Sequence, residues 1–162
     1  MSDEPRLTHL DERGVARMVD VTSKEATTRR AVARGQIRMA EKTLDALIDG
    51  SLEKGEALPV ARLAGIQAGK RTSDLIPLCH ALPGASITVE LNPDPSLPGV
   101  IARAEARYRG RTGVEMEALT AVSVALLTLY DMAKALDRGM VIEDIRLELK
   151  EGGASGRWEA PE

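Results

Sequence analysis

The stretch Val100-Ile101-Ala102-Arg103-Ala104-Glu105-Ala106-Arg107-Tyr108 decides the fold class, because small or apolar residues occupy every second position along it. Such alternation is typical of a half-buried strand. Ile87, Val89 and Leu91 alternate with polar neighbours in the same way, and the intervening segment 92–99 holds three prolines and a glycine. The two stretches are therefore predicted to form a hairpin joined by a loop.

The segment after this hairpin is predicted to form a long helix from about Val114 to Asp137, roughly 35 Å in length at ~1.5 Å per residue. Gly139 ends it. The tetrapeptide Thr112-Gly113-Val114-Glu115 fits a capping box, so we interpret Glu115 as a helix-start residue rather than a catalytic one. The free N–H groups of the glycine turn before the helix would also suit a phosphate.

Weaker patterns predict the remaining elements. These elements are a short strand at 18–22, an extended segment at 31–39, and helices at 40–48 and from near Pro59. A last strand is also predicted, in which Ile145, Leu147 and Leu149 face inward while Arg146, Glu148 and Lys150 face outward. This order predicts an α+β fold, an antiparallel sheet with helices packed on one face. We expect one domain over residues 1–162, with a polar lead-in at 1–18 and a flexible tail at 151–162.

The composition excludes several classes of protein. The net charge of −3 is spread along the chain, so no basic face for nucleic acid or a membrane surface is expected. No apolar run approaches the ~20 residues of a membrane span, and the N-terminus lacks a signal peptide. A single Cys provides no disulfide framework, thiolate zinc site or iron–sulfur cluster. We therefore expect a cytoplasmic protein with no metal and no cofactor.

Basic residues are unevenly divided, since Arg far outnumbers Lys. Where charge alone is needed this sequence uses Arg, so each Lys is a candidate for work that needs a compact, titratable amine. Random drift in composition is the alternative. The six lysines are Lys24, Lys42, Lys54, Lys70, Lys134 and Lys150.

One polar stripe runs along the predicted long helix. At ~100° per residue, Glu117, Thr120, Thr128 and Asp131 lie within about 80° of one another, with Lys134 at the edge. The stripe is either the solvent face of the helix or the wall of a polar cavity. Asp131 and Lys134, three residues apart, are equally compatible with a surface ion pair.

The loop Ile76-Pro77-Leu78-Cys79-His80 is a second candidate site. His80 is either a structural histidine or the best proton carrier in the chain, because its ordinary pKa is near neutral. Cys79 has no partner at ligand spacing, so a buried, inert thiol is expected rather than a metal ligand.

Two basic segments could bind phosphate. Gly69-Lys70-Arg71-Thr72 fails the phosphate-loop pattern in its spacing, but Lys70 and Arg71 could still bind phosphates at a helix end. Lys54, in a predicted loop, is either solvated or directed into a pocket.

The sequence resembles the MoaC family, the cyclic pyranopterin monophosphate synthases of molybdenum-cofactor biosynthesis. Two specific motifs carry the resemblance, Lys70-Arg71-Thr72-Ser73-Asp74-Leu75-Ile76-Pro77-Leu78-Cys79-His80 and Gly113-Val114-Glu115-Met116-Glu117-Ala118-Leu119-Thr120-Ala121. Shorter matches extend it from about Leu7 to Trp158. The chain departs from the family pattern at Ala81, Arg111 and Ala154.

The resemblance implies a ferredoxin-like fold and a homohexamer, a trimer of dimers with its active site at a subunit interface. It implies a lyase that converts the 3′,8-cyclised GTP made by a radical-SAM cyclase into cyclic pyranopterin monophosphate, with release of pyrophosphate. It places Asp131, Lys54, Lys134 and His80 in catalysis. The substrate-binding residues that it implies are Leu78, Cys79, His80, Met116, Glu117, Lys70 and Lys150, and we add Glu115 and Arg71 as further candidates.

A division of labour follows as a hypothesis. His80, Asp131 and Lys134 would move protons, and Lys54, Lys70 and Arg71 would stabilise the triphosphate and the leaving pyrophosphate. The alternatives are a non-catalytic ligand-binding module of the same fold and a structural subunit that supports the cyclase.

Overall fold

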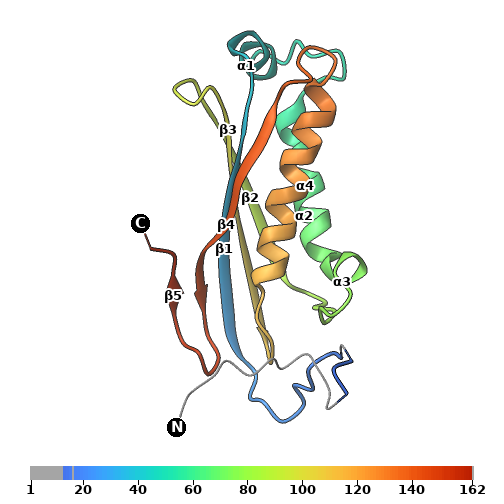
Figure 1. Ribbon diagram of the computed structural model, residues 1–162, viewed down its shortest axis with the longest axis vertical. Coiled ribbons are helices and arrows are strands. Elements are labelled where there is room, and N and C mark those ends of the chain that lie inside the picture. Colours follow the sequence, from blue (N-terminus) through green and yellow to red (C-terminus); the bar gives the residue numbers. More distant parts are fainter. Residues whose placement is uncertain (1–12, 16, 162) are drawn as a thin grey trace.

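A five-stranded antiparallel sheet forms one layer of the computed structural model, which describes residues 13–15 and 17–161 (Figure 1). The strand order is β2-β3-β1-β4-β5. The hairpin predicted from the alternating stretches is confirmed, since Val89 pairs with Ala104 and Leu91 with Ala102. The strands are β1 (Thr27–Arg38), β2 (Ser86–Asp94), β3 (Gly99–Gly110), β4 (Val141–Glu151) and β5 (Trp158–Glu159).

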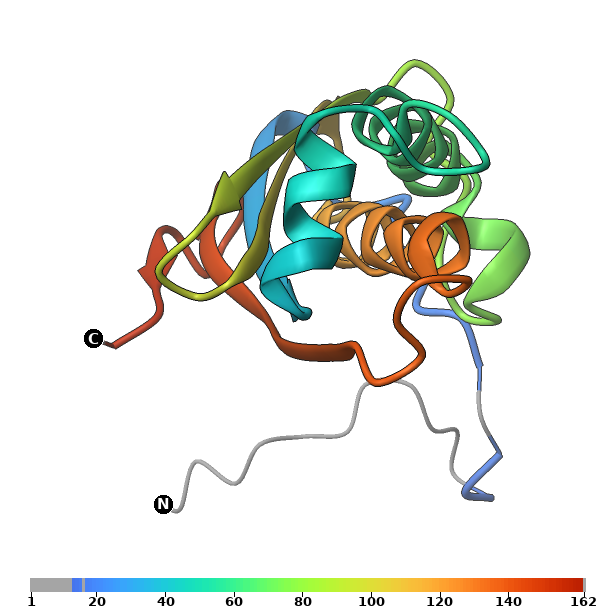
Figure 2. The same ribbon diagram turned by 90° about the horizontal axis from the view of Figure 1, so that it is seen from above.

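Helices cover one face of this sheet. They are α1 (Glu41–Ile48), α2 (Ala57–Lys70), the short α3 (Thr72–Leu75) and α4 (Glu115–Ala133). The two long helices, α2 and α4, lie side by side on the same side of the sheet (Figures 1 and 2). The predicted α+β class is therefore confirmed, and the arrangement is ferredoxin-like.

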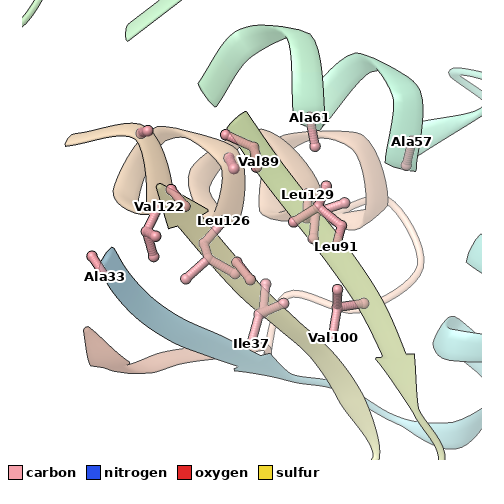
Figure 3. Packing of buried hydrophobic residues seen from close by; sticks show 14 of the residues in the cluster. Ala33, Ile37, Ala57, Ala61, Val89, Leu91, Val100, Val122, Leu126 and Leu129 are labelled. Carbon is pink, nitrogen blue, oxygen red and sulfur yellow. The ribbon is translucent and has the colours of Figure 1, made fainter. Parts of the chain in front are cut away.

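The core lies between α4 and the sheet and consists of aliphatic side chains. Leu126 and Leu129 of α4 are fully buried, as are Ile37 of β1 and Val100 of β3 (Figure 3). Each such side chain stabilises the fold by roughly 1.5–3 kcal/mol relative to an exposed one. The inner faces of β1 and β3 carry alanines, whose small side chains let the helix approach the sheet closely. Because of this close approach, aliphatic side chains fill the core without any Phe.

The close approach of α2 to α4 depends on a glycine. A Cβ at Gly65 would lie 2.7 Å from the carbonyl oxygen of Ala121 and 3.1 Å from the Cβ of Ala125, both in α4. Gly69, one turn later, is nearly as tight. Backbone approaches backbone here, so no side chain can be added at Gly65 unless the helices move apart.

Helix α4 meets the length and composition of a membrane span, contrary to the expectation that no apolar run would come near it. Half of its apolar window is buried inside the structure, against the sheet and α2. Its apolar composition is therefore that of a core helix.

Three local predictions are wrong. The capping box at the start of α4 does not form, because the N-cap is Val114 and no side chain caps the helix. Residues 18–22 form no strand and instead run irregularly beside the loop that contains His80. Helix α4 also ends at Ala133, four residues before the predicted end.

The alternation predicted for the last strand is also wrong. Asp144 has a φ of 59°, and the pairing of β4 with β1 shifts register in two places. These irregularities change which face each side chain takes. Ile145 is 39% exposed. Leu149 pairs with Val32, and these two side chains are buried on the face of the sheet opposite the main core.

Ion pairs cover that outer face. Arg30 binds Glu105 at 2.7 Å and Glu151 at 3.2 Å, and these charged side chains lie over Val32. Other pairs on this face are Arg34–Asp144, Arg34–Glu148, Arg38–Glu143, Arg103–Glu148 and Arg157–Glu151. Each exposed pair contributes at most about 1 kcal/mol, so the layer keeps the face polar more than it stabilises the fold.

We predict that Gly65→Ala destabilises the protein by roughly 1–3 kcal/mol, because the new methyl group would press against the Ala121 carbonyl. Helix propensity alone predicts the opposite sign, a gain of about 1 kcal/mol. Urea denaturation at fixed protein concentration measures the difference. Gln67→Ala, at an exposed position of the same helix, is the control and should change stability little; a stabilised Gly65→Ala variant would contradict the packing argument.

Candidate active site

A cavity of about 310 Å³, here called cavity A, opens at the N-terminal end of α4. One wall is the loop Leu78–His80, which follows α3. The opposite wall is the first turn of α4, with Glu115, Met116 and Glu117. The sequence predicted all six of these residues as substrate-binding, and the fold brings them together around one space.

Glu117 is the buried carboxyl group of cavity A, with only 5% of its surface exposed. Burial raises its pKa to about 7, and the neighbouring Glu115 carboxylate acts in the same direction. Burial also raises the pKa of the Cys79 thiol, with Glu117 as a second cause. At neutral pH Glu117 is therefore poised to take or give a proton, whereas Cys79 is a thiol rather than a nucleophilic thiolate.

His80 is held by a backbone carbonyl across the cavity. Its Nε2 lies 3.1 Å from the carbonyl oxygen of Val19, which can only accept a hydrogen bond. Nε2 therefore carries the proton in this contact, and Nδ1 is the nitrogen that remains to accept one. A fixed acceptor on one ring nitrogen selects the tautomer of a histidine, so this contact also sets the orientation of the ring.

A second polar cluster lies at the C-terminal end of α4. It consists of Asp131 and the two lysines bound to it, Lys54 and Lys134, and is here called the lysine triad. The Asp131 carboxylate accepts from Lys54 Nζ at 2.6 Å and from Lys134 Nζ at 2.7 Å. Lys54 Nζ also donates to the backbone carbonyl of Asp131, at 3.1 Å. The hydrogen bonds from Lys134 and Lys54 lower the pKa of Asp131 to about 2, so this group is a carboxylate at neutral pH.

The lysine triad and cavity A are separate within one chain. Glu117 and Asp131 are fourteen residues apart in α4, which corresponds to about 21 Å along the helix axis. His80, Asp131 and Lys134, which we expect to move protons, therefore do not line the same cavity within one subunit. The polar stripe predicted on this helix changes character along its length, since Glu117 and Thr120 are buried whereas Asp131 is half exposed.

Three other predicted residues line neither cluster. Lys70 is exposed at the end of α2, and Arg71 is bound to Asp74 at 3.1 Å. Lys150 was predicted to face outward, but it pairs with the buried Ala31 and its Nζ contacts the Ser155 hydroxyl.

Sequence reasoning missed part of cavity A. Val19, Lys24 and Thr112 also line it. The excess of Arg over Lys had singled out Lys24 as a titratable amine, but nothing in its local pattern indicated a cavity. In the part of the chain that the structure describes, no group of three or more His, Cys, Asp or Glu side chains could hold a metal ion.

Comparison with known proteins identifies the family. The model of the MoaC family matches residues 18–153. A protein of Cereibacter sphaeroides named cyclic pyranopterin monophosphate synthase is 60% identical over 95% of this chain and 97% of its own length. Proteins of the same name from Dinoroseobacter shibae (95% of this chain, 98% of its own) and Brucella ovis (94% and 93%) are each 58% identical. The chain therefore belongs to the MoaC family.

Proposed function

We propose that this chain is a lyase that converts the 3′,8-cyclised GTP intermediate into cyclic pyranopterin monophosphate, releasing pyrophosphate, in molybdenum-cofactor biosynthesis. The observation that carries the proposal is cavity A, in which the ends of the two family motifs meet around a buried, titratable carboxyl group. Relatives about 60% identical over nearly their whole length carry the name of this activity. We expect the reaction to take place in the cytoplasm.

The reaction needs groups that move protons and groups that hold negative charge. A triphosphate becomes a cyclic monophosphate when a hydroxyl oxygen of the same molecule attacks the α-phosphorus. The bond from this phosphorus to the oxygen bridging to the β-phosphate breaks, and pyrophosphate leaves with the electron pair. The hydroxyl proton goes to a base. Opening and closing of the purine and pterin rings require further proton transfers, for which general acid–base catalysis is suited.

Cavity A supplies two proton carriers in this proposal. His80 Nδ1 is free to accept a proton, since Nε2 is committed to the Val19 carbonyl. Glu117, with its pKa near 7, can act as acid or base at the same pH. Leu78, Met116 and Val19 give the cavity apolar walls suited to a flat heterocycle.

The lysine triad supplies cationic groups. One carboxylate, Asp131, is shared by two ammonium groups, so the triad carries a net positive charge. When substrate displaces one ammonium group from Asp131, that amine can transfer a proton while the other lysine stays paired. Asp131 itself is too acidic to serve as the donor.

A second subunit would unite the two clusters. We infer a homohexamer, a trimer of dimers, in which the triad of one subunit completes cavity A of a neighbour. Support comes from apolar side chains around the triad: Leu127, one turn before Asp131, is 57% exposed, and Leu136, just after Lys134, is 51% exposed. Exposed Leu next to a charged cluster is typical of a surface that another subunit covers. Lys70, Arg71 and Lys150 stay predicted substrate contacts that the same assembly would have to bring in.

The substrate also defines a functional partner. A cyclised GTP requires an enzyme that joins a ribose carbon to the purine, and the resemblance implies a radical-SAM GTP cyclase for this step. We propose a link through the shared intermediate rather than a fixed complex.

The direct test is incubation of the purified protein with the cyclised GTP intermediate. We expect stoichiometric pyrophosphate and a product that yields a fluorescent pterin after oxidation. Saturable binding without pyrophosphate release would contradict the proposal and favour a non-catalytic binding module.

We predict that Asp131→Asn lowers turnover by about 100-fold or more while the protein stays folded, because the amide no longer holds two ammonium groups. Asp45→Asn, on the exposed face of α1, is the matched control and should retain full turnover. Steady-state kinetics and circular dichroism measure the two effects. A loss of only a few-fold would show that Asp131 merely decorates the surface.

We predict that mixed assemblies of two inactive variants, His80→Gln and Asp131→Asn, recover activity. If the two residues act in one site but come from different subunits, random mixing restores about a quarter of the sites. Co-expression with two affinity tags and pyrophosphate assays of doubly tagged protein measure this recovery. His80→Gln mixed with Glu117→Gln is the control and should recover nothing, because both residues belong to cavity A. No recovery in the first mixture would contradict a shared site.

We predict that Glu117 makes the stability of the protein fall as the pH rises from about 4.5 to 7. In this window the native carboxyl group keeps a proton that the unfolded one releases, so deprotonation favours unfolding. The stability of Glu117→Gln relative to wild type should therefore increase over this window, by up to about 3 kcal/mol. Urea denaturation from pH 4.5 to 8 measures it. An unchanged difference, as expected for the exposed Glu53→Gln control, would contradict the burial argument.

A further inference from the structure

Segment 19–24 forms one wall of cavity A without belonging to a helix or strand of the described chain. Val19, Val21 and Lys24 line the cavity, whereas Asp20 and Thr22 are exposed. Because the sheet does not include this segment, its shape depends on hydrogen bonds within it and on its contacts with the cavity.

Two successive turns give the segment its shape. The Oδ1 atom of Asp20 accepts a hydrogen bond from the backbone N–H of Thr22 at 2.9 Å, which is an Asx turn. The second turn follows at once, since the N–H of Lys24 donates to the carbonyl oxygen of Val21 at 3.1 Å. The hydrogen bond from the Thr22 N–H lowers the pKa of Asp20, so its side chain is an acceptor-only carboxylate at neutral pH.

The Asx turn begins at the peptide bond whose carbonyl binds His80. The Val19 carbonyl oxygen, 3.1 Å from His80 Nε2, lies in the same rigid peptide plane as the N–H of Asp20. The direction of this oxygen therefore changes with the backbone torsion angles of Asp20. Because the Asx turn fixes the path of the chain from Asp20 to Thr22, it also restrains the direction of the Val19 carbonyl.

We propose that Asp20 is a positioning residue for His80: by orienting the Val19 carbonyl, its carboxylate keeps the proton of the neutral ring on Nε2 and leaves Nδ1 free to accept one. The use of Nδ1 as a base rests on the proposed function. Asp20 does not line cavity A itself and acts through the Val19 carbonyl. This acceptor lies 61 positions before His80 in the sequence, so the residues next to the histidine do not supply it.

A second Asx turn in the chain provides a matched control. In the loop between β2 and β3, Asp94 Oδ1 accepts from the N–H of Ser96 at 2.9 Å. The two turns have the same hydrogen bond, but Asp94 does not line or adjoin the segment that binds His80. Asp94→Ala therefore removes an equal turn without disturbing the Val19 carbonyl.

The test is solid-state NMR of the assembled protein labelled with ¹⁵N-histidine. The chain has two histidines, so a His9→Gln background leaves the His80 ring alone to be observed. At mildly alkaline pH, where the ring is neutral, we expect the parent protein to carry the proton on Nε2. Asp20→Ala should shift the ratio of the two tautomers toward Nδ1–H by roughly 2- to 10-fold, as expected when one hydrogen bond is lost.

Two further variants show whether the turn causes this shift. Asp20→Asn should keep the ratio of the parent protein, because the amide oxygen also forms an Asx turn. Asp94→Ala should keep it as well, because its turn lies in another loop. An unchanged ratio in Asp20→Ala, or an equal shift in either of the other two variants, would overturn the inference even if the wild type turns over.

Turnover distinguishes this inference from the proposed function. In assays with the cyclised GTP intermediate, Asp20→Ala should lower kcat by roughly 2- to 10-fold and Asp20→Asn should restore it, because the transition state depends on the same tautomer. KM should change less than about twofold, since the turn that holds Lys24 does not involve the Asp20 side chain. If the tautomer ratio shifts in Asp20→Ala but the wild type releases no pyrophosphate, the proposed function fails and the positioning role stands.

Discussion

The contact between Gly65 of α2 and the backbone of Ala121 in α4 is the constraint on which the rest of the structure depends. It lets α4 pack closely against both its neighbour α2 and the sheet, where Leu126 and Leu129 fill the core. Both ends of α4 carry residues of the proposed site, since its first turn lines cavity A and its last turn holds Asp131. A displacement of this helix would move both clusters together, so precise small-residue packing fixes the geometry of the site at a distance.

Two carboxyl groups on this one helix show how environment selects their roles. Glu117 is buried beside another acid, and its pKa rises toward neutrality. Asp131 lies between two ammonium groups, and its pKa falls far below its usual range. The first can exchange protons at neutral pH, and the second is a permanent anion that organises cations. Pairs of acids driven apart in this way are characteristic of sites that need both a proton carrier and a fixed charge.

Much of the fold could be predicted from the sequence, because the hairpin and α4 have strong periodicity. The irregular parts could not be. The segment at 18–22 has an apolar pattern typical of a strand, but its residues face cavity A, a tertiary contact that local pattern does not encode. The same distinction holds for the candidate site. The two motifs of the sequence predicted that Leu78–His80 and Glu115–Glu117 belong to it, whereas the residues around Lys24 gave no indication that Lys24 lines cavity A. The distance between Glu117 and Asp131 follows from helix length alone, because both residues belong to the predicted long helix.

The bulge at Asp144 has a further consequence for the open side of β4. Within the described residues, β5 covers this strand only at Leu149 and Lys150, so the stretch from Val141 to Leu147 presents unpaired backbone groups. A flat, apolar strand in this position would be a template for fibrils. The left-handed φ of Asp144 and the changes of register bend the strand out of the straight geometry that such stacking requires. The irregularity that hides this strand from pattern analysis thus keeps the folded protein from growing edge to edge.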